Sequence, residues 1–255
     1  MILKTPDAFK NKTALVTGAS RGIGKALALA LAERGAHVLA LARNKQKLEE
    51  LDDLIKSKKG RSTLIPCDLR QQNTIEELSH LIEQRWGKLD ILVINAAILG
   101  PLTPIIDLDE QELYNVFAIN SFASWRLMRA FNTLLQKAAA GRALVLSSSV
   151  AHKIKPYWAA YGASKAALEI FARSWAEEVK HSNLRINIVN PGGTRTDMRA
   201  QAMPGEDPLT LPSAEEIAEK ILPLLSEDFL ETGQLYDYRQ NSLMEYIIPQ
   251  PKLNN

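Results

Sequence analysis

Cysteine is almost absent from this sequence: Cys67 is the only one among 255 residues. A lone cysteine excludes a disulfide bond within the chain. The opening residues MILKTPDAFK also lack the basic start and apolar run of a secretory signal. Both absences predict a protein of a reducing compartment, and we expect a cytoplasmic location.

Long apolar runs and runs of one charge are missing too. The longest apolar stretches, residues 26–32 and 91–102, are far shorter than the roughly 20 residues that cross a bilayer, and Asn95 and Gly100 interrupt the second. The 31 basic residues are interspersed with 29 acidic ones, so no basic surface for nucleic acid is predicted. The four histidines lack metal-ligand spacing. We therefore predict no membrane span, no nucleic-acid partner and no metal site.

Short apolar runs alternate with stretches of helical period from Thr13 onward, without a linker or repeat. This pattern predicts a single α/β domain over residues 1–255, a Rossmann fold whose doubly wound parallel sheet of seven strands has helices on both faces. Ligands of such sheets bind beyond the carboxyl ends of the strands. The predicted strands are 14–18, 36–42, 62–67, 89–95, 142–147, 184–190 and 234–238, and the predicted helices are 25–35, 45–57, 74–86, 109–140, 161–181 and 213–226.

A glycine-rich turn follows the first predicted strand. Without side chains at its glycines, a pyrophosphate can approach the start of the next helix, whose free N–H groups and dipole bind anions. The spacing is G-x3-G-x-G, which differs from the commoner G-x-G-x-x-G. A purely structural turn is the alternative, but the strand-turn-helix context favours a dinucleotide cofactor. We expect cofactor contacts from Gly18, Ser20, Arg21, Gly22, Ile23 and Gly24.

No carboxylate lies between Arg34 and Leu48. Dehydrogenases that prefer NAD usually have an acid there, about 20 positions after the glycine loop, which binds the ribose 2′-hydroxyl. Ala42 occupies that place and Arg43 follows it. Arg43 and Arg21 can converge on a 2′-phosphate, so we predict NADP(H) as the cofactor. The alternative is that both arginines are solvated surface cations.

Residues 141–168 place a run of serines at a strand end and a Tyr-x-x-x-Lys motif at a helix start. Tyr161 and Lys165 are four positions apart, so both project from one helix face. Together with the glycine loop, these residues resemble the classical short-chain dehydrogenase/reductase family, whose members pair the two motifs with a serine 13 positions before the tyrosine and an asparagine in the preceding helix. The resemblance implies the catalytic set Asn120, Ser148, Tyr161 and Lys165.

The resemblance covers nearly the whole chain and implies further cofactor residues. Asp68 matches an adenine contact, 95–97 matches the family's NAG motif with Ala97 in place of glycine, and 191–198 matches the segment that holds the nicotinamide carboxamide. The subgroup it points to is that of bacterial reductases near the 3-oxoacyl-carrier-protein reductases, without naming a substrate. Besides the glycine loop and Arg43, the implied cofactor contacts are Asp68, Leu69, Asn95, Ala96, Tyr161, Lys165, Pro191, Gly192, Thr194 and Thr196.

The resemblance also implies a role for each catalytic residue in carbonyl reduction. Tyr161 would give a proton to the carbonyl oxygen, Ser148 would polarise that oxygen, and Lys165 would bind the ribose and lower the pKa of the phenol. Asn120 would hold a water of a proton relay. Bringing a phenol from a pKa near 10 to near 7 takes roughly 4 kcal/mol, about what one cation about 4 Å away supplies at an effective dielectric of about 20.

We therefore predict an NADP(H)-dependent oxidoreductase that interconverts a small-molecule carbonyl and its alcohol, in the ketone-reducing direction. A catalytically weak NADP(H)-binding regulator and an NAD-dependent alcohol dehydrogenase remain alternatives. The complete set of catalytic residues argues against the regulator. An epimerase or dehydratase would need a larger substrate domain.

The segment 198–212 contains three prolines and a glycine, so it cannot be one long helix, and we interpret it as a mobile substrate flap. Its apolar lining suits a hydrophobic or aromatic carbonyl. Residues 249–255 are expected to form a flexible C-terminal tail. His152 is a candidate for the mouth of the site. The expected substrate contacts are Val150, Tyr157, Trp158, Met198 and Met203.

Four aromatic residues in the helices 109–140 and 161–181 lie off the predicted core stripe. The resemblance implies that these helices are buried in a two-fold interface, so we expect a homo-oligomer, a tetramer or a dimer. The four residues are Phe122, Trp125, Phe171 and Trp175.

Overall fold

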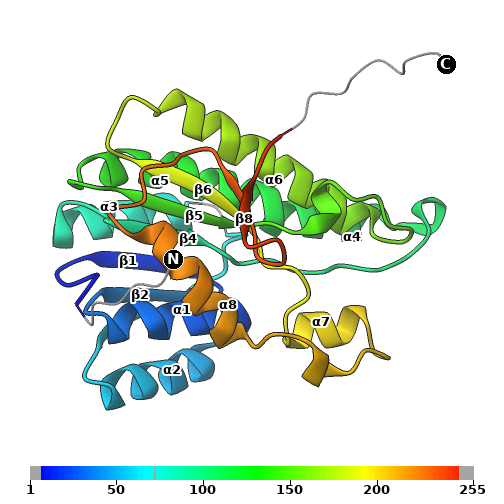
Figure 1. The fold of residues 1–255 in the computed structure, drawn as a ribbon, viewed down its shortest axis with the longest axis horizontal. Coiled ribbons are helices and arrows are strands. Elements are labelled where there is room, and N and C mark those ends of the chain that lie inside the picture. Colours follow the sequence, from blue (N-terminus) through cyan, green and yellow to red (C-terminus); the bar gives the residue numbers. More distant parts are fainter. Residues whose placement is uncertain (1–6, 72, 247–255) are drawn as a thin grey trace.

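Residues 7–71 and 73–246 are described by the computed structural model, drawn as a ribbon in Figure 1. They form one eight-stranded sheet with helices on both faces, which confirms the predicted α/β class. The strands are β1 (Thr13–Thr17), β2 (His37–Ala42), β3 (Arg61–Pro66), β4 (Ile91–Ile94), β5 (Arg142–Leu146), β6 (Arg185–Asn190), β7 (Leu235–Asp237) and β8 (Ser242–Met244). Their order across the sheet is β3-β2-β1-β4-β5-β6-β7-β8.

The sequence predicted seven strands, and β8 is the one it missed. The pairs from β3 to β7 are parallel, whereas β8 returns antiparallel to β7. It has only three residues, of which Ser242 and Leu243 are exposed. A strand this short and this exposed has neither the alternation nor the apolar run that marks a strand in a sequence.

Two helical layers enclose the sheet (Figure 1). Strand side chains alternate between them: Ala14 and Val16 pack into the first layer, and Leu15 packs into the second. Because both faces are buried, the inner strands are almost continuously apolar. The first layer contains α1 (Gly22–Glu33), α2 (Lys45–Ser57) and α8 (Ala214–Ile221); the second contains α3 (Thr74–Trp86), α5 (Ser124–Gln136) and α6 (Ala159–Glu178).

The single helix predicted over 109–140 is interrupted in the structure. Helix α4 covers Glu110–Phe117, Ala118–Ala123 form a π-helical segment, and α5 follows. Asn120 lies in the π-helical segment and is fully buried. Such segments occur mostly as single turns and often at functional sites. The sequence did not show this one because a local widening leaves the apolar periodicity on both sides intact.

Two of the four aromatic side chains expected outside the core belong to it. Trp175 is 6% exposed and donates its indole N–H to Oδ1 of Asn132 at 2.9 Å, and Phe171 packs against the same core. The prediction was wrong for Trp175 because α5 packs on α6 and covers it, and Phe171 is partly buried. Phe122 and Trp125 remain 49% and 41% exposed.

The structure confirms the prediction that the segment 198–212 does not form one long helix. Helix α7 covers Asp197–Ala202, and Pro208–Thr210 form a separate 3-10 turn. Arg199 of α7 forms a two-pronged ion pair with Glu206 in the connecting segment, with N–O distances of 2.5 and 2.6 Å. The predicted tail 249–255 lies outside the described residues. Within 7–71 and 73–246, no helix has the length and apolar character to cross a membrane.

Candidate active site

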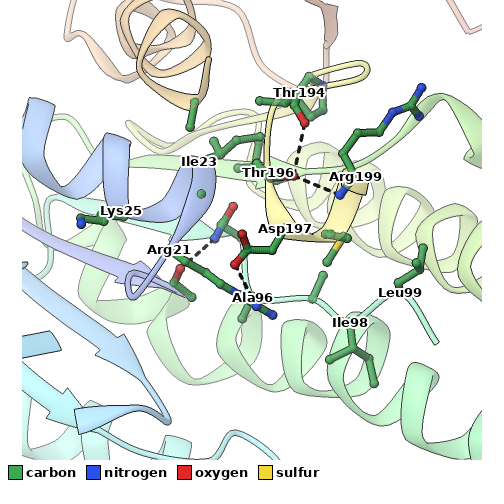
Figure 2. Close-up of a pocket in the computed structure, with 18 of the residues that line it drawn as sticks. Arg21, Ile23, Lys25, Ala96, Ile98, Leu99, Thr194, Thr196, Asp197 and Arg199 are labelled. Atoms are coloured by element: carbon green, nitrogen blue, oxygen red, sulfur yellow. Dashed lines mark hydrogen bonds and ion pairs between the residues drawn. The ribbon is translucent and has the colours of Figure 1, made fainter. Parts of the chain in front are cut away.

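A cavity of about 570 Å³ opens beyond the carboxyl ends of the central strands. Figure 2 shows part of its lining, with Arg21 and Ile23 from the glycine loop opposite Thr194, Thr196 and Asp197. All predicted cofactor residues line it except Gly24. Gly24 serves packing instead, because a Cβ there would lie 2.4 Å from the carbonyl oxygen of Gly18.

The glycine loop is shaped for close approach of a ligand. Gly18 and Gly22 have φ of +67° and +55°, a region that favours glycine. Asn95, at the end of β4, ties the loop down by donating its side-chain amide to the carbonyl of Thr17 at 3.0 Å. The turn leads into α1, whose first turn contains no acidic residue and no side-chain cap. Its free N–H groups can therefore bind an anion.

Charged side chains lie at both sides of this loop. Arg43 lines the cavity directly after Ala42, and no carboxylate stands at that strand end. The guanidinium of Arg21 lies 3.4 Å from the carboxylate of Asp197 at the start of α7 (Figure 2). Asp68 is paired with Arg70 at 2.6 Å, and this guanidinium lowers the pKa of the Asp68 carboxyl.

Thr194 offers a test of whether a cofactor fits here. Its hydroxyl lines the cavity and is buried, and no described residue bonds to it. A buried hydroxyl without a partner costs free energy, so the site lacks one polar group that a ligand can provide. The neighbouring Thr196 caps α7 by accepting from the N–H of Arg199 at 3.3 Å. The glycine cradle, the free helix start and Thr194 together fit a dinucleotide with an amide at this end.

Tyr161 and Lys165 lie in the first two turns of α6 and are almost completely buried. The ammonium of Lys165 donates to the carbonyl of Leu146 at 2.7 Å and lies 5.7 Å from the centre of the Tyr161 ring. Burial lowers the pKa of Lys165 to about 8, and the charge of Glu169 opposes that fall. Burial raises the pKa of Tyr161 to about 12. The prediction that the phenol pKa lies below its ordinary value was wrong for this arrangement, because burial of Tyr161 raises it.

Ser147 and Ser148 both border the cavity but differ in their bonding. Ser148 lines the cavity at the end of β5, as its spacing from Tyr161 implied. Ser147 is buried and donates its hydroxyl to the carboxylate of Glu169. Glu169 was not among the predicted site residues, although its position four residues after Lys165 places it on the same helix face.

Asn120 lies behind the cavity and does not line it. Its side-chain oxygen accepts from the N–H of Ile98 at 2.9 Å, and its amide donates to the carbonyl of Ile98 at 2.9 Å and to Ser164 at 3.0 Å. The side chain therefore joins the segment after β4 to α6. The predicted role of holding a water stays a prediction.

An apolar wall adjoins the hydroxyl of Tyr161. The sulfur of Met198 lies 4.0 Å from that hydroxyl, and the ring centres of Trp158 and Tyr161 are 6.0 Å apart. Besides Tyr161, the wall consists of the predicted Val150, Trp158, Met198 and Met203 and the unpredicted Leu99, Leu102 and Ala202.

Two predicted residues of the mouth lie elsewhere. The side chain of Tyr157 is 58% exposed and does not line the cavity, and its backbone has a φ of +73°, which is unusual for a residue other than glycine. The ring of His152 is bonded to Glu169 at 2.8 Å, which keeps it out of the cavity. Both residues lie in the segment between β5 and α6, which mixes polar and apolar residues, so the sequence alone could not assign the directions of these two side chains.

The comparisons with known proteins agree with this geometry. Residues 12–207 match the family model described as short chain dehydrogenase. The chain is 36% identical over 238 residues to the uncharacterized oxidoreductase YciK of Escherichia coli (strain K12), a match that covers 91% of this chain and 93% of YciK.

Solved structures show the same similarity. A Pseudomonas syringae protein described as a short chain dehydrogenase superposes with a TM-score of 0.90 at 38% identity, over 93% of this chain and 98% of that chain. A protein of E. coli CFT073, described in the same way and complexed with NADPH, gives a TM-score of 0.86 at 35% identity, over 91% of this chain and 98% of that one. None of these three is named as a 3-oxoacyl reductase, so that subgroup stays a prediction. The fold, the cavity and these matches show that the chain belongs to the short-chain dehydrogenase family of oxidoreductases.

Proposed function

We propose that this enzyme uses NADPH to reduce an apolar or aromatic carbonyl compound to its alcohol, with Tyr161 as the proton donor. One observation supports the proposal above all. A single cavity joins the glycine loop and Arg43 at one end to Ser148, Tyr161 and Lys165 at the other. A dinucleotide bound along it would have its phosphates at α1 and its reactive ring beside Tyr161.

The choice of NADP(H) rests on charge. Arg43 lines the cavity at the end of β2, and the residue before it is Ala42 instead of an acid. A guanidinium there favours a 2′-phosphate, whereas an acid would favour the free hydroxyl of NAD. The similar E. coli CFT073 protein was crystallised with NADPH.

The bound cofactor supplies the hydride. Ser148 would donate a hydrogen bond to the substrate oxygen, and Tyr161 would donate its proton to the same oxygen. Because burial raises the pKa of Tyr161 to about 12, its hydroxyl is protonated at neutral pH, the state that reduction requires. The ammonium of Lys165, 5.7 Å from the ring, would stabilise the phenolate that results.

The apolar wall supports the substrate class. Trp158 and Met198 line the cavity beside Tyr161, and Met203 packs in the same apolar cluster; methionines adapt to varied apolar shapes. A hydrophobic or aromatic body would bury against this wall, whereas a sugar would leave its hydroxyls without partners.

Turnover with isotope tracing tests the proposal. The enzyme is mixed with NADPH deuterated on the nicotinamide ring and with a panel of ketones, diketones, 3-oxoacyl thioesters and quinones. We expect deuterium on the carbinol carbon of at least one product. Tight NADPH binding without any product would favour the regulatory alternative, and faster oxidation of alcohols with NAD would favour the alcohol dehydrogenase.

A further inference from the structure

A buried carboxylate that the proposed reaction does not use lies one helical turn after Lys165. Glu169 in α6 is 2% exposed. Three donors surround it: the hydroxyl of Ser147, the hydroxyl of Tyr246 at 3.0 Å and the ring Nε2 of His152 at 2.8 Å.

The donors come from two parts of the chain outside α6, the segment between β5 and α6 and the residues after β8. Ser147 follows β5, His152 lies in the loop after it, and Tyr246 follows β8 near the end of the described residues. Taking a carboxylate out of water costs several kcal/mol unless well-placed hydrogen bonds replace the solvent. Because three segments must meet to satisfy this one group, Glu169 fixes their relative positions.

Two of these donors flank the predicted catalytic serine. Ser147 directly precedes Ser148, and His152 follows it by four residues. One turn earlier on the same helix, Lys165 bonds to the carbonyl of Leu146 at 2.7 Å. The turn that carries Ser148 is thus held to α6 on both of its sides.

Glu169 also acts on Lys165 through its charge. The two residues are four apart on one helix face and both are buried. The negative charge of Glu169 raises the pKa of Lys165 against the larger effect of burial. The Tyr161 ring faces Lys165. Glu169 is faced by Ser147, His152 and Tyr246. The guanidinium of Arg173 stacks 3.6 Å from the Tyr246 ring.

We propose that Glu169 is a positioning residue of this active site, which fixes the Ser148 turn through Ser147 and His152 and provides the counter-charge of Lys165. It touches neither substrate nor cofactor. This inference rests on the proposed function for its effect on rate, but its effect on Lys165 can be measured without turnover.

The decisive experiment follows the NMR signal of the Lys165 side chain against pH in the folded enzyme, with the signal assigned by its loss in Lys165→Arg. Glu169→Gln removes the charge and keeps the shape, so we expect the Lys165 midpoint to fall by on the order of one pH unit. Tyr246→Phe is the matched control, because it breaks one hydrogen bond at the same carboxylate and leaves the charge. Its midpoint should equal that of the wild type.

An unchanged midpoint in Glu169→Gln would overturn the counter-charge role. If the buried amide prevents folding, Glu169→Leu removes the same charge, and replacement of a buried ion by an apolar residue is often tolerated.

Ser147→Ala tests whether Glu169 fixes the turn that carries Ser148. We expect kcat to fall at least about tenfold because Ser148 would be displaced, with KM for NADPH and the Lys165 midpoint unchanged. Unchanged kcat in Ser147→Ala would overturn the turn role. Absence of all carbonyl reduction by the wild type would instead refute the proposed function and leave the NMR result standing.

Discussion

The ammonium of Lys165 donates a hydrogen bond of 2.7 Å to the carbonyl oxygen of Leu146. Leu146 ends β5 and Ser148 lies two residues later, so this bond joins the helix of Tyr161 to the strand end of Ser148. The bond also holds Lys165 in a buried place, where its pKa falls to about 8. Stability should therefore depend on pH in a defined way.

Between about pH 8 and 10.5, the ordinary pKa of lysine, Lys165 binds a proton more weakly in the folded than in the unfolded chain. The free energy of unfolding should therefore rise with pH across that window, by at most about 3 kcal/mol. Tyr161, with its pKa raised from 10.0 to about 12, has the opposite effect above pH 10. Urea unfolding at several pH values checks this. Lys165→Met should flatten the rise below pH 10, and an unchanged slope in that variant would contradict the buried site.

Coenzyme choice depends on Arg43. We expect Arg43→Asp to weaken NADPH binding by roughly 10- to 100-fold, the worth of a hydrogen bond between charged groups, and to change NADH binding little. Fluorescence titration with both coenzymes measures this. Lys45→Asp is the control, because this substitution changes the charge by the same amount two residues away. Lys45 pairs with Glu49 and does not line the cavity. Equal affinities of the wild type for both coenzymes would refute the NADP(H) proposal.

The flap should affect substrate and not cofactor. Met203 belongs to the apolar wall, so Met203→Asp should raise KM for carbonyl substrates about tenfold, by placing a charge in an apolar site. The dissociation constant of NADPH should stay the same. Leu209→Asp serves for comparison, because Leu209 is in the same segment but 79% exposed. If both variants have the wild-type KM, residues 198–212 do not contact substrate.

Sequence reasoning brought the Tyr-x-x-x-Lys motif and the predicted cofactor segments to one cavity, because fixed spacings at strand ends determine where those residues meet. The periodicity alone predicts that the serine run lies at the end of β5 and that Tyr161 and Lys165 share one helix face. The bond from Lys165 to Leu146 did not follow, since it depends on the rotamer of a long side chain in the folded core. The pKa shifts depend on that burial and were therefore missed as well.

The contacts of Glu169, Ser147 and Tyr246 show the same limit. A glutamate in a helix is most often solvated, whereas Glu169 is buried here because the segment after β5 and the residues after β8 both lie against it. Likewise, the burial of Trp175 could not be predicted without knowing that α5 packs against α6. Asn120 was placed in a helix correctly, but its bonds to Ile98 arise from a π-helical turn that leaves no mark in the sequence.

Two exposed aromatic side chains support the expected oligomer. Phe122 lies in the π-helical segment and Trp125 three residues later at the start of α5, where the guanidinium of Arg129 stacks on the Trp125 ring at 4.9 Å. We expect light scattering to give at least twice the chain mass of 28.3 kDa. The double variant Phe122→Glu and Trp125→Glu should dissociate, whereas Leu81→Glu, at an exposed position on α3, should not. A wild-type mass of 28.3 kDa would contradict the expectation.

Tyr161→Phe tests the central claim most directly, because it removes only the hydroxyl that is to give its proton to the substrate. NADPH affinity and the rate of carbonyl reduction are measured side by side for the wild type and the variant, with the best substrate of the panel. We predict that the variant binds NADPH with wild-type affinity and that its kcat falls by about 10² to 10⁴, the usual contribution of a placed acid. A variant that binds NADPH normally and keeps more than about a tenth of the wild-type rate would contradict the role of Tyr161 as proton donor.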